Sequence, residues 1–163
     1  MSLLWRRRLS MKPFNILRMR KAAPPAVAQT LRPNSTISTS GLTNGGYADI
    51  NEATANDSNE VSLFGSGATM LLGMTDPSEA VGSNPTLRYR ARRQSGSPPL
   101  TIRILEGATE RASTSQAISN GSHSGFSWVP DLSAVTNYND LRVELGSPSA
   151  AIYVSWLELE ILP

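Results

Sequence analysis

Arginine is the residue of this chain best suited to recognition chemistry, with thirteen arginines against only two lysines. A guanidinium binds a carboxylate or a phosphate through two parallel hydrogen bonds, which suits it to interfaces. In the segment TLRYRARR, arginines alternate with apolar residues, so one set faces a core and the other faces outward. We predict that these outward side chains contribute to a protein interface: Arg88, Arg90 and Arg92. We expect Arg93 and Arg103 to extend the same basic face, and a solvated face that blocks edge pairing is the alternative.

A second group of basic residues lies at the start of the chain. Eight basic residues precede Pro33 and no acid precedes Asp49, whereas the rest of the chain carries seven basic and thirteen acidic residues, a formal charge of −6. A segment so unbalanced in charge does not fold alone and is expected to order on a partner. The residues of this arm predicted to contact a partner are aromatic, aliphatic and basic: Trp5, Arg6, Arg7, Arg8, Phe14, Ile16, Leu17, Arg18, Arg20 and Lys21.

The apolar residues within the arm favour a protein partner over a nucleic acid, because they would fill grooves as well as neutralise charge. Phosphates also attract such arms, but the chain has no nucleic-acid recognition motif. A Pro-rich spacer at 22–28 would link the arm to the body. A solvated tail and an Arg-rich mitochondrial transit peptide are the alternatives. No run approaches the roughly 20 apolar residues that span a bilayer, so we expect no membrane partner.

Catalytic and metal-binding patterns are weak. His123 is the only histidine and sits in a Ser/Gly-rich stretch, so we interpret it as a solvated loop residue. The acidic residues between Asp49 and Glu60 could bind calcium through oxygen ligands, but they lack EF-hand spacing and are interpreted as a solvated loop. There is no cysteine, which excludes thiol catalysis and disulfides. We therefore predict no catalytic residue, no cofactor and no metal, and a protein that is not an enzyme.

Three aromatic residues could stack on sugar rings if they were exposed: Trp128, Tyr138 and Trp156. The alternative is that they belong to the core, and Trp156 lies in the most apolar segment of the chain, so we expect it to be buried.

The elements that position these residues are predicted to be strands. Apolar residues alternate with polar ones over 86–93, 100–106 and 140–145, with Gly, Ser, Asn and Pro between them. We predict that 86–93 and 100–106 are neighbours in one sheet, and that 140–145 and 151–161 form a C-terminal hairpin. The last segment is apolar on both faces, which predicts a strand covered on both sides. Residues 109–124 have only weak strand character.

About eight strands and no long amphipathic helix predict an all-β protein. We expect a two-sheet antiparallel β-sandwich of jelly-roll type, with an extended basic N-terminal arm. The predicted organisation is an arm with its spacer at 1–37 and a sandwich domain at 38–163.

Residues 31–163 resemble small jelly-roll virion proteins of tailed bacteriophages, of the head decoration (cement) or neck and tail type. The resemblance rests on the segments TNGGYADINEA, RYRARR, LTIRILEG, NDLRVELG and AIYVSWLELEI in this order. It implies a structural role in the virion after assembly in the host cytoplasm. It also implies a homo-oligomer, for which a trimer is one form, and partners such as the major capsid protein or neck and tail subunits.

Three functions follow as hypotheses. The first is a capsid decoration protein whose arm anchors it to neighbouring subunits, with a neck, tail or tail-fibre protein as a variant of the same class. The second is a carbohydrate-binding, receptor-recognising β-sandwich, which requires an exposed Trp128 or Tyr138. The third is an enzyme acting on polysaccharide, which requires two carboxylates at catalytic separation in a cleft.

Overall fold

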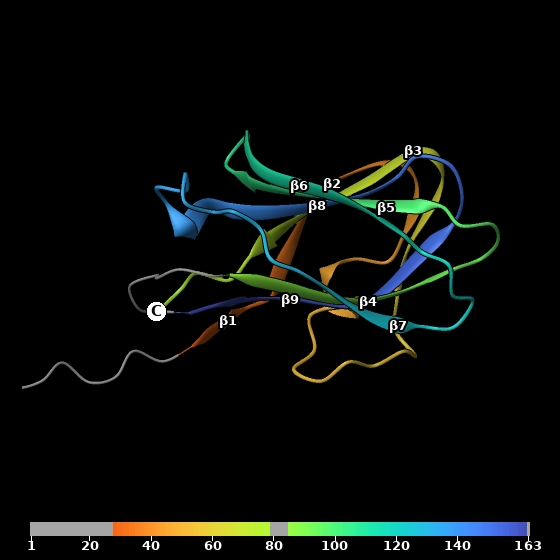
Figure 1. The fold of residues 1–163 in the computed structure, drawn as a ribbon, viewed down its shortest axis with the longest axis horizontal. Helices are drawn as coiled ribbons and strands as arrows, with labels where there is room; N and C mark the ends of the chain where they lie inside the picture. Colours follow the sequence, from red (N-terminus) through yellow and green to blue (C-terminus); the bar gives the residue numbers. More distant parts are fainter. Residues whose placement is uncertain (1–27, 79–84, 163) are drawn as a thin grey trace, which may run out of the picture.

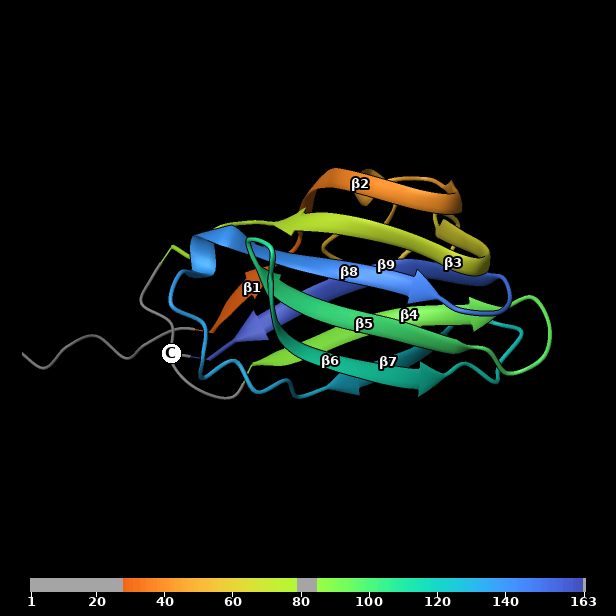
Figure 2. The same ribbon diagram turned by 90° about the horizontal axis from the view of Figure 1, so that it is seen from above.

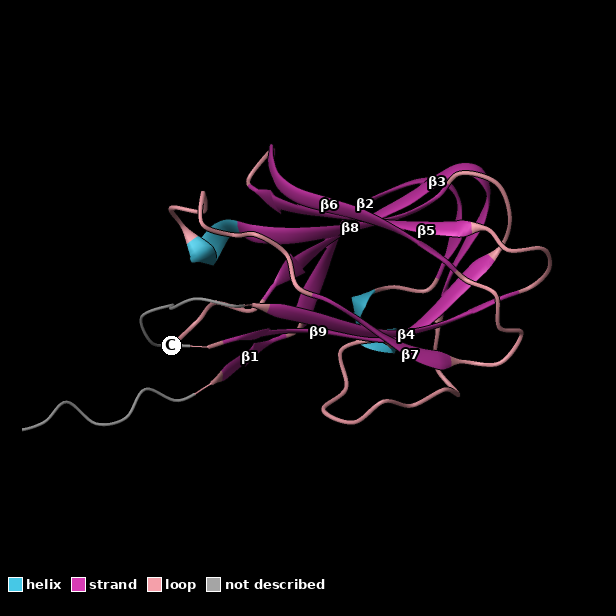
Figure 3. Ribbon diagram, in the orientation of Figure 1, coloured by secondary structure: helices cyan, strands magenta, loops and turns pink. Residues whose placement is uncertain are grey.

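A computed structural model describes residues 28–78 and 85–162 of the chain. The described residues form nine strands and two short 3-10 helices, in the order shown in Figures 1 and 3. The strands are β1 (Gln29–Leu31), β2 (Pro33–Asn44), β3 (Val61–Met74), β4 (Thr86–Arg93), β5 (Pro99–Glu106), β6 (Thr109–Ala117), β7 (Ser124–Trp128), β8 (Leu141–Ser147) and β9 (Ile152–Ile161). The 3-10 helices are η1 (Tyr47–Asp49) and η2 (Tyr138–Asp140). No described helix is long and apolar enough to cross a membrane.

The strands form two facing layers of one curled antiparallel sheet (Figure 1). The upper layer runs β6-β5-β8-β3 with β2 beside β3, as Figure 2 shows from above. The lower layer contains β9, β4 and β7, with β1 on the other edge of β9. This arrangement confirms the prediction of an all-β sandwich.

Strand β3 belongs to both layers. Its first residues, Val61 to Leu63, pair with β9, and its later residues, Ala68 to Gly73, pair with β8. Between them, Gly65 and Gly67 adopt φ angles of 78° and 79°, a left-handed conformation that glycine enters without steric cost. These two glycines allow the strand to turn from one layer to the other.

The core lies between the layers and follows the period-two alternation of the strands. In β4, Leu87, Tyr89 and Ala91 are buried while the arginines point outward. Each large apolar side chain that leaves water in this way, such as Leu87, stabilises the fold by roughly 1.5–3 kcal/mol.

Strand β9 corrects the prediction of a strand covered on both faces. A bulge places Ser155 between two register positions, since Arg90 pairs with Trp156 and Ala91 pairs with Val154. The extra residue reverses the alternation, so apolar residues before and after it face the same core. All five are fully buried: Ile152, Val154, Leu157, Leu159 and Ile161.

Two predicted strand pairings are wrong. Strand β4 pairs with β7 and β9, whereas β5 pairs with β6 and β8, so these consecutive strands lie in different layers. Likewise β8 and β9 do not pair with each other, and the connection between them crosses from the upper to the lower layer. The segment predicted to be a weak strand contains β6, which pairs with β5 along its whole length.

The predicted domain boundary at residue 37 falls inside β2. The sheet already includes β1, because Gln29 to Leu31 pair with β9, and Leu31 is buried in the core. The sandwich therefore begins at least nine residues before its predicted start. The arm residues predicted to bind a partner, from Trp5 to Lys21, lie outside the described residues.

Candidate functional site

Residues 51–60 cover the outer face of the lower layer and bring acidic side chains onto it (Figure 1). Two backbone carbonyls, one in this segment and one in the residue just before it, attach it to β9. Ile50 accepts a hydrogen bond from the Leu157 amide at 3.1 Å, and Glu52 accepts one from the Trp156 indole Nε1 at 2.9 Å. Trp156 is thus half-buried on the outer face, which corrects the prediction that it belongs to the core.

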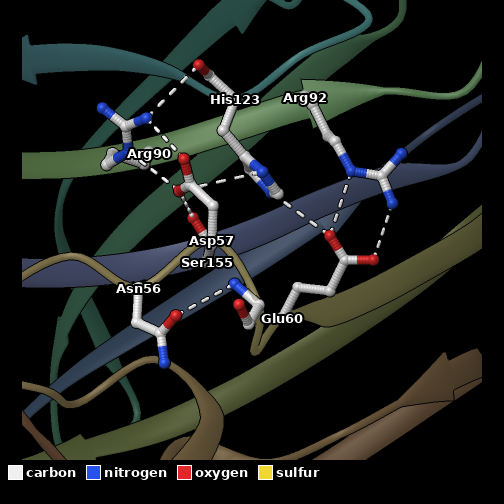
Figure 4. Close-up of polar contacts among 8 residues, drawn as sticks. Asn56, Asp57, Glu60, Arg90, Arg92, His123 and Ser155 are labelled. Carbon is white, nitrogen blue, oxygen red and sulfur yellow. Dashed lines mark hydrogen bonds and ion pairs between the residues drawn. The ribbon is translucent and has the colours of Figure 1, made fainter.

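Five side chains form a charge cluster on this face: Asp57, Glu60, Arg90, Arg92 and His123 (Figure 4). Arg90 donates from Nε and Nη2 to the two carboxylate oxygens of Asp57, at 2.9 and 2.6 Å. Arg92 binds Glu60 in the same way, at 3.0 and 2.7 Å. Bidentate pairs of this kind fix both partners in orientation as well as in distance.

Two residues of β9 at and near the bulge contact the cluster. The Ser155 hydroxyl donates to Asp57 Oδ1 at 2.8 Å, and the Arg92 guanidinium lies 3.8 Å from the centre of the Tyr153 ring. A hydrogen bond from the Arg90 side chain is the largest cause that lowers the pKa of Asp57 to about 2. Asp57 therefore stays ionised throughout the physiological pH range.

His123 lies between the two carboxylates. Its Nε2 is 3.2 Å from Glu60 Oε2 and its Nδ1 is 3.7 Å from Asp57 Oδ1, and its side chain is only 7% exposed. The prediction of a solvated loop residue is therefore wrong. Its ring is enclosed by residues 51–60 and by β4, which are distant in sequence.

The arginines predicted to form an interface all have partners within the chain. Arg88 lies 2.5 Å from Glu160 and 3.6 Å from Glu158 on β9, in addition to the two pairs of the charge cluster. Arg103 does not extend this face, because it belongs to β5 in the upper layer. A role for Arg88, Arg90 and Arg92 in binding another chain stays a prediction.

The acidic stretch considered for calcium is largely committed to other contacts. Asp57 and Glu60 bind arginines, and Asp49 Oδ2 accepts the Gly46 amide at 2.8 Å. Among residues 28–78 and 85–162, no group of three or more His, Cys, Asp or Glu side chains is arranged to hold a metal ion.

The upper layer carries a different kind of surface, which we call the β5–β6 hollow. It is an open depression of about 440 Å³, and the six described residues that line it are all polar: Thr101, Arg103, Glu110, Ser113, Thr114 and Ser115. Register places Thr101 opposite Ser115 and Arg103 opposite Ser113, so these four share the outer face.

Arg103 lines the hollow, and its side chain is 41% exposed. It donates from Nε to Glu110 at 2.6 Å and from Nη1 to Glu144 at 2.6 Å. Hydrogen bonds from Arg103 and then from Ser113 lower the pKa of Glu110, so its carboxylate is ionised at neutral pH.

The aromatic rings predicted to stack on sugars do not form a platform. Trp128 and Tyr138 are half-buried and pack against the hydrophobic core. Trp128 lies opposite Leu87 in the β4–β7 pairing, on the side of the sheet that faces the interior. Carbohydrate recognition by these two rings is therefore not supported.

No protein-family model and no curated protein matches this chain. Among solved structures, it is similar to the C-terminal CBM6 of the laminarinase LamC from Zobellia galactanivorans, at 14% identity and a TM-score of 0.50. The match covers 82% of this chain and 98% of that module. This similarity shows a shared fold and supports the predicted jelly-roll sandwich.

Two further structures align less closely. A CBM6 of lichenase 5A from Cellvibrio mixtus, solved with cellotriose, is 11% identical with a TM-score of 0.44, covering 83% of this chain and 96% of that one. A CBM36 domain of a xylanase from the hindgut metagenome of Trinervitermes trinervoides is 13% identical with a TM-score of 0.47 and the same coverage. Nothing in the comparisons indicates a bacteriophage virion protein.

Sequence reasoning missed both sites for different reasons. The hollow has a local signal, since Ser113 and Ser115 alternate as Thr101 and Arg103 do, but the Ser/Thr-rich composition of this segment indicates only a weak strand. The charge cluster had none, because His123 lies more than 60 residues from Glu60 in the sequence.

Proposed function

We propose that this chain is a non-enzymatic carbohydrate-binding module that contacts sugar hydroxyls through the β5–β6 hollow. The observation that carries the proposal is the shared fold with the LamC module, which extends over nearly the whole of that module. A fold alone does not determine a function, so the proposal also depends on the chemistry of this surface.

The hydrogen-bonding groups of the hollow suit a ligand rich in hydroxyls. A guanidinium has five N–H donors, and Arg103 uses one for Glu110 and one for Glu144, which leaves three for a ligand. Ser113 and Ser115 are exposed. The Ser113 hydroxyl already donates to Glu110 and can accept from a ligand, whereas the Ser115 hydroxyl can donate and accept. A sugar hydroxyl also does both, so one ring can satisfy several of these groups together.

The charge of the hollow favours a neutral sugar. Arg103 contributes one positive charge, and the carboxylates of Glu110 and Glu144 contribute two negative charges. Acidic sugars and sulfated polysaccharides would meet a net negative surface, which disfavours their approach. Since no aromatic ring is among the described residues that line the hollow, we expect binding by hydrogen bonds and modest affinity.

A structural role in a virion stays a prediction without support from the fold comparisons. The arm on which that prediction depends lies outside the described residues. The partners and location that it implies also stay predictions.

Calorimetric titration with neutral oligosaccharides tests the proposal. Cellotriose, laminari-oligosaccharides and xylo-oligosaccharides form a suitable panel, with an acidic oligosaccharide added for comparison. We expect at least one neutral ligand to bind the full chain, and the double variant Ser113→Ala/Ser115→Ala to weaken binding about tenfold, as expected when two hydrogen bonds are lost.

The matched control is Ser127→Ala. Ser127 is also an exposed strand serine, but it lies on β7 opposite Arg88, in the other layer. Its replacement should leave affinity within twofold of the parent. Absence of binding to every sugar, or equal affinity of the double variant and the parent, would contradict the proposal.

A further inference from the structure

The imidazole of His123 is enclosed but incompletely bonded. Its Nε2 atom is buried and has no hydrogen-bond partner among the described residues, although Glu60 Oε2 is only 3.2 Å away. A buried polar atom without a partner is costly and is uncommon in folded proteins. Neither the fold nor the proposed sugar site requires this arrangement, which lies in the layer opposite the β5–β6 hollow.

The charges around the ring already balance. The charged groups that face it are Asp57 and Glu60 from residues 51–60, and Arg90 and Arg92 from β4. Two carboxylates and two guanidinium groups sum to zero, so a neutral imidazole leaves the cluster neutral. Protonation would place one unbalanced positive charge on a side chain that is only 7% exposed.

Burial is the main cause that lowers the pKa of His123 below its usual value of 6.5. The two carboxylates act in the opposite direction, and the two arginines add to the effect of burial. A lowered pKa in the folded state means that the neutral ring stabilises this arrangement above about pH 6.5. That contribution is lost as the pH falls below 6.5, because the unfolded or released ring binds a proton more readily.

We propose that His123 is a pH-sensitive latch, which holds the turn at residues 119–123 against residues 51–60 at neutral pH and releases it in mild acid. Released, the imidazolium would be hydrated. The latch joins segments that are more than 60 residues apart, so its release would loosen the lower layer at the start of β7.

The turn is the part expected to move, because residues 51–60 are held more firmly. Asp57 is bound by Arg90 and Ser155, Glu60 by Arg92, and Glu52 by the Trp156 indole. The turn has fewer anchors besides His123. They are the Arg93 amide to the Asn120 carbonyl at 2.9 Å, the Arg93 side chain to the Ser119 carbonyl at 2.6 Å, and a 3.4 Å contact from Arg90 to the His123 carbonyl.

The titration of His123 can be followed directly by NMR, since the chain has a single histidine and its imidazole signals need no assignment. We expect a pKa below 6.5 in the folded full chain. Amide hydrogen exchange at pH 7.5 and pH 5, corrected for intrinsic rates, then reports release of the turn. The Arg93 amide donates to the Asn120 carbonyl of this turn, so its protection should fall severalfold when the turn is released.

Two references make the result specific. Strand β8 lies in the core and should keep its protection at both pH values. The variant His123→Gln cannot titrate and keeps a polar side chain at this position, so its turn should keep the same protection at pH 5 as at pH 7.5. A pKa of 6.5 or higher, unchanged protection in the parent, or an equal loss in the variant would overturn the latch. If the variant does not fold, the pKa and the exchange of the parent decide the question.

Discussion

The two outer faces of this sandwich carry similar residues and differ in how those residues are bonded. On the lower layer, Arg90 and Arg92 each bind one carboxylate through two hydrogen bonds, and their side chains are 32% and 29% exposed. On the upper layer, Arg103 shares single bonds with two carboxylates, and its side chain is 41% exposed beside the exposed residues Ser113 and Ser115. Each arginine of the charge cluster is fixed to one partner, whereas Arg103 lies among exposed hydroxyls that a ligand can reach.

This difference shows that an arginine-rich strand is not in itself a binding surface. The outward alternation of β4 was predicted correctly from its sequence, yet Arg90 and Arg92 each bind a carboxylate of the same chain and are only 32% and 29% exposed. A ligand can use only the donors and acceptors that it can reach. The β5–β6 hollow combines a more exposed arginine with exposed serines, so it is the better candidate, although it has only one arginine among its described lining residues.

The largest effect is expected from deleting Glu158, a residue of β9 beyond the bulge. Because side chains alternate along a strand, this deletion shifts the residues after Leu157 by one position, and Leu159 and Ile161 would point to the outside. Moving two buried side chains into water costs roughly 3–6 kcal/mol, which is a large part of the stability of a domain. We expect the deletion variant to be unfolded by circular dichroism.

The control for this deletion is Ser155→Ala, which keeps the bulge and removes only the hydroxyl bonded to Asp57. It should fold and lose about 1 kcal/mol in urea unfolding. A folded, cooperative deletion variant would contradict the register assigned to β9 beyond the bulge.

A smaller effect is expected when the free energies of unfolding of Arg92→Met and Arg103→Met are compared, since each variant removes an arginine from one of the two faces. Arg92→Met removes both hydrogen bonds to Glu60 and the contact with the Tyr153 ring, and it leaves a partly buried carboxylate beside His123. We expect a loss of about 1–3 kcal/mol in the free energy of unfolding.

Arg103→Met removes ion pairs in which arginine and Glu110 are both 41% exposed, and such pairs contribute less than about 1 kcal/mol. Urea unfolding of both variants under the same conditions measures the difference. If Arg103→Met destabilises the protein as much as Arg92→Met, the distinction drawn between the arginines of the two faces is wrong.

Sequence patterns predicted the fold class because alternation reports which side of a strand is buried. They did not predict which layer a strand joins, since β4 and β5 show the same alternation whether they are neighbours or lie in opposite layers. The predicted C-terminal hairpin was wrong for the same reason. A short connection such as the one between β8 and β9 can turn back within one sheet or cross to the other.

The sites depended on contacts that have no local signal. The bulge at Ser155 is set by the register against β4, and the apolar residues around it were interpreted as a strand buried on both faces. The surroundings of His123 include Asp57 and Glu60 of residues 51–60, which only the tertiary structure brings next to it. In contrast, the hydroxyls of β6 were visible in the sequence, and recognising them required knowing that β6 pairs with β5.

The most direct test of the proposed function is an NMR titration of the isotope-labelled full chain with the neutral oligosaccharide that binds best in calorimetry. Chemical-shift changes should be largest at the amides of Thr101, Ser113 and Ser115, and the amides of Arg90 and His123 should be unaffected. The largest changes falling on the charge cluster or around Trp128, or the absence of any saturable change, would contradict the account.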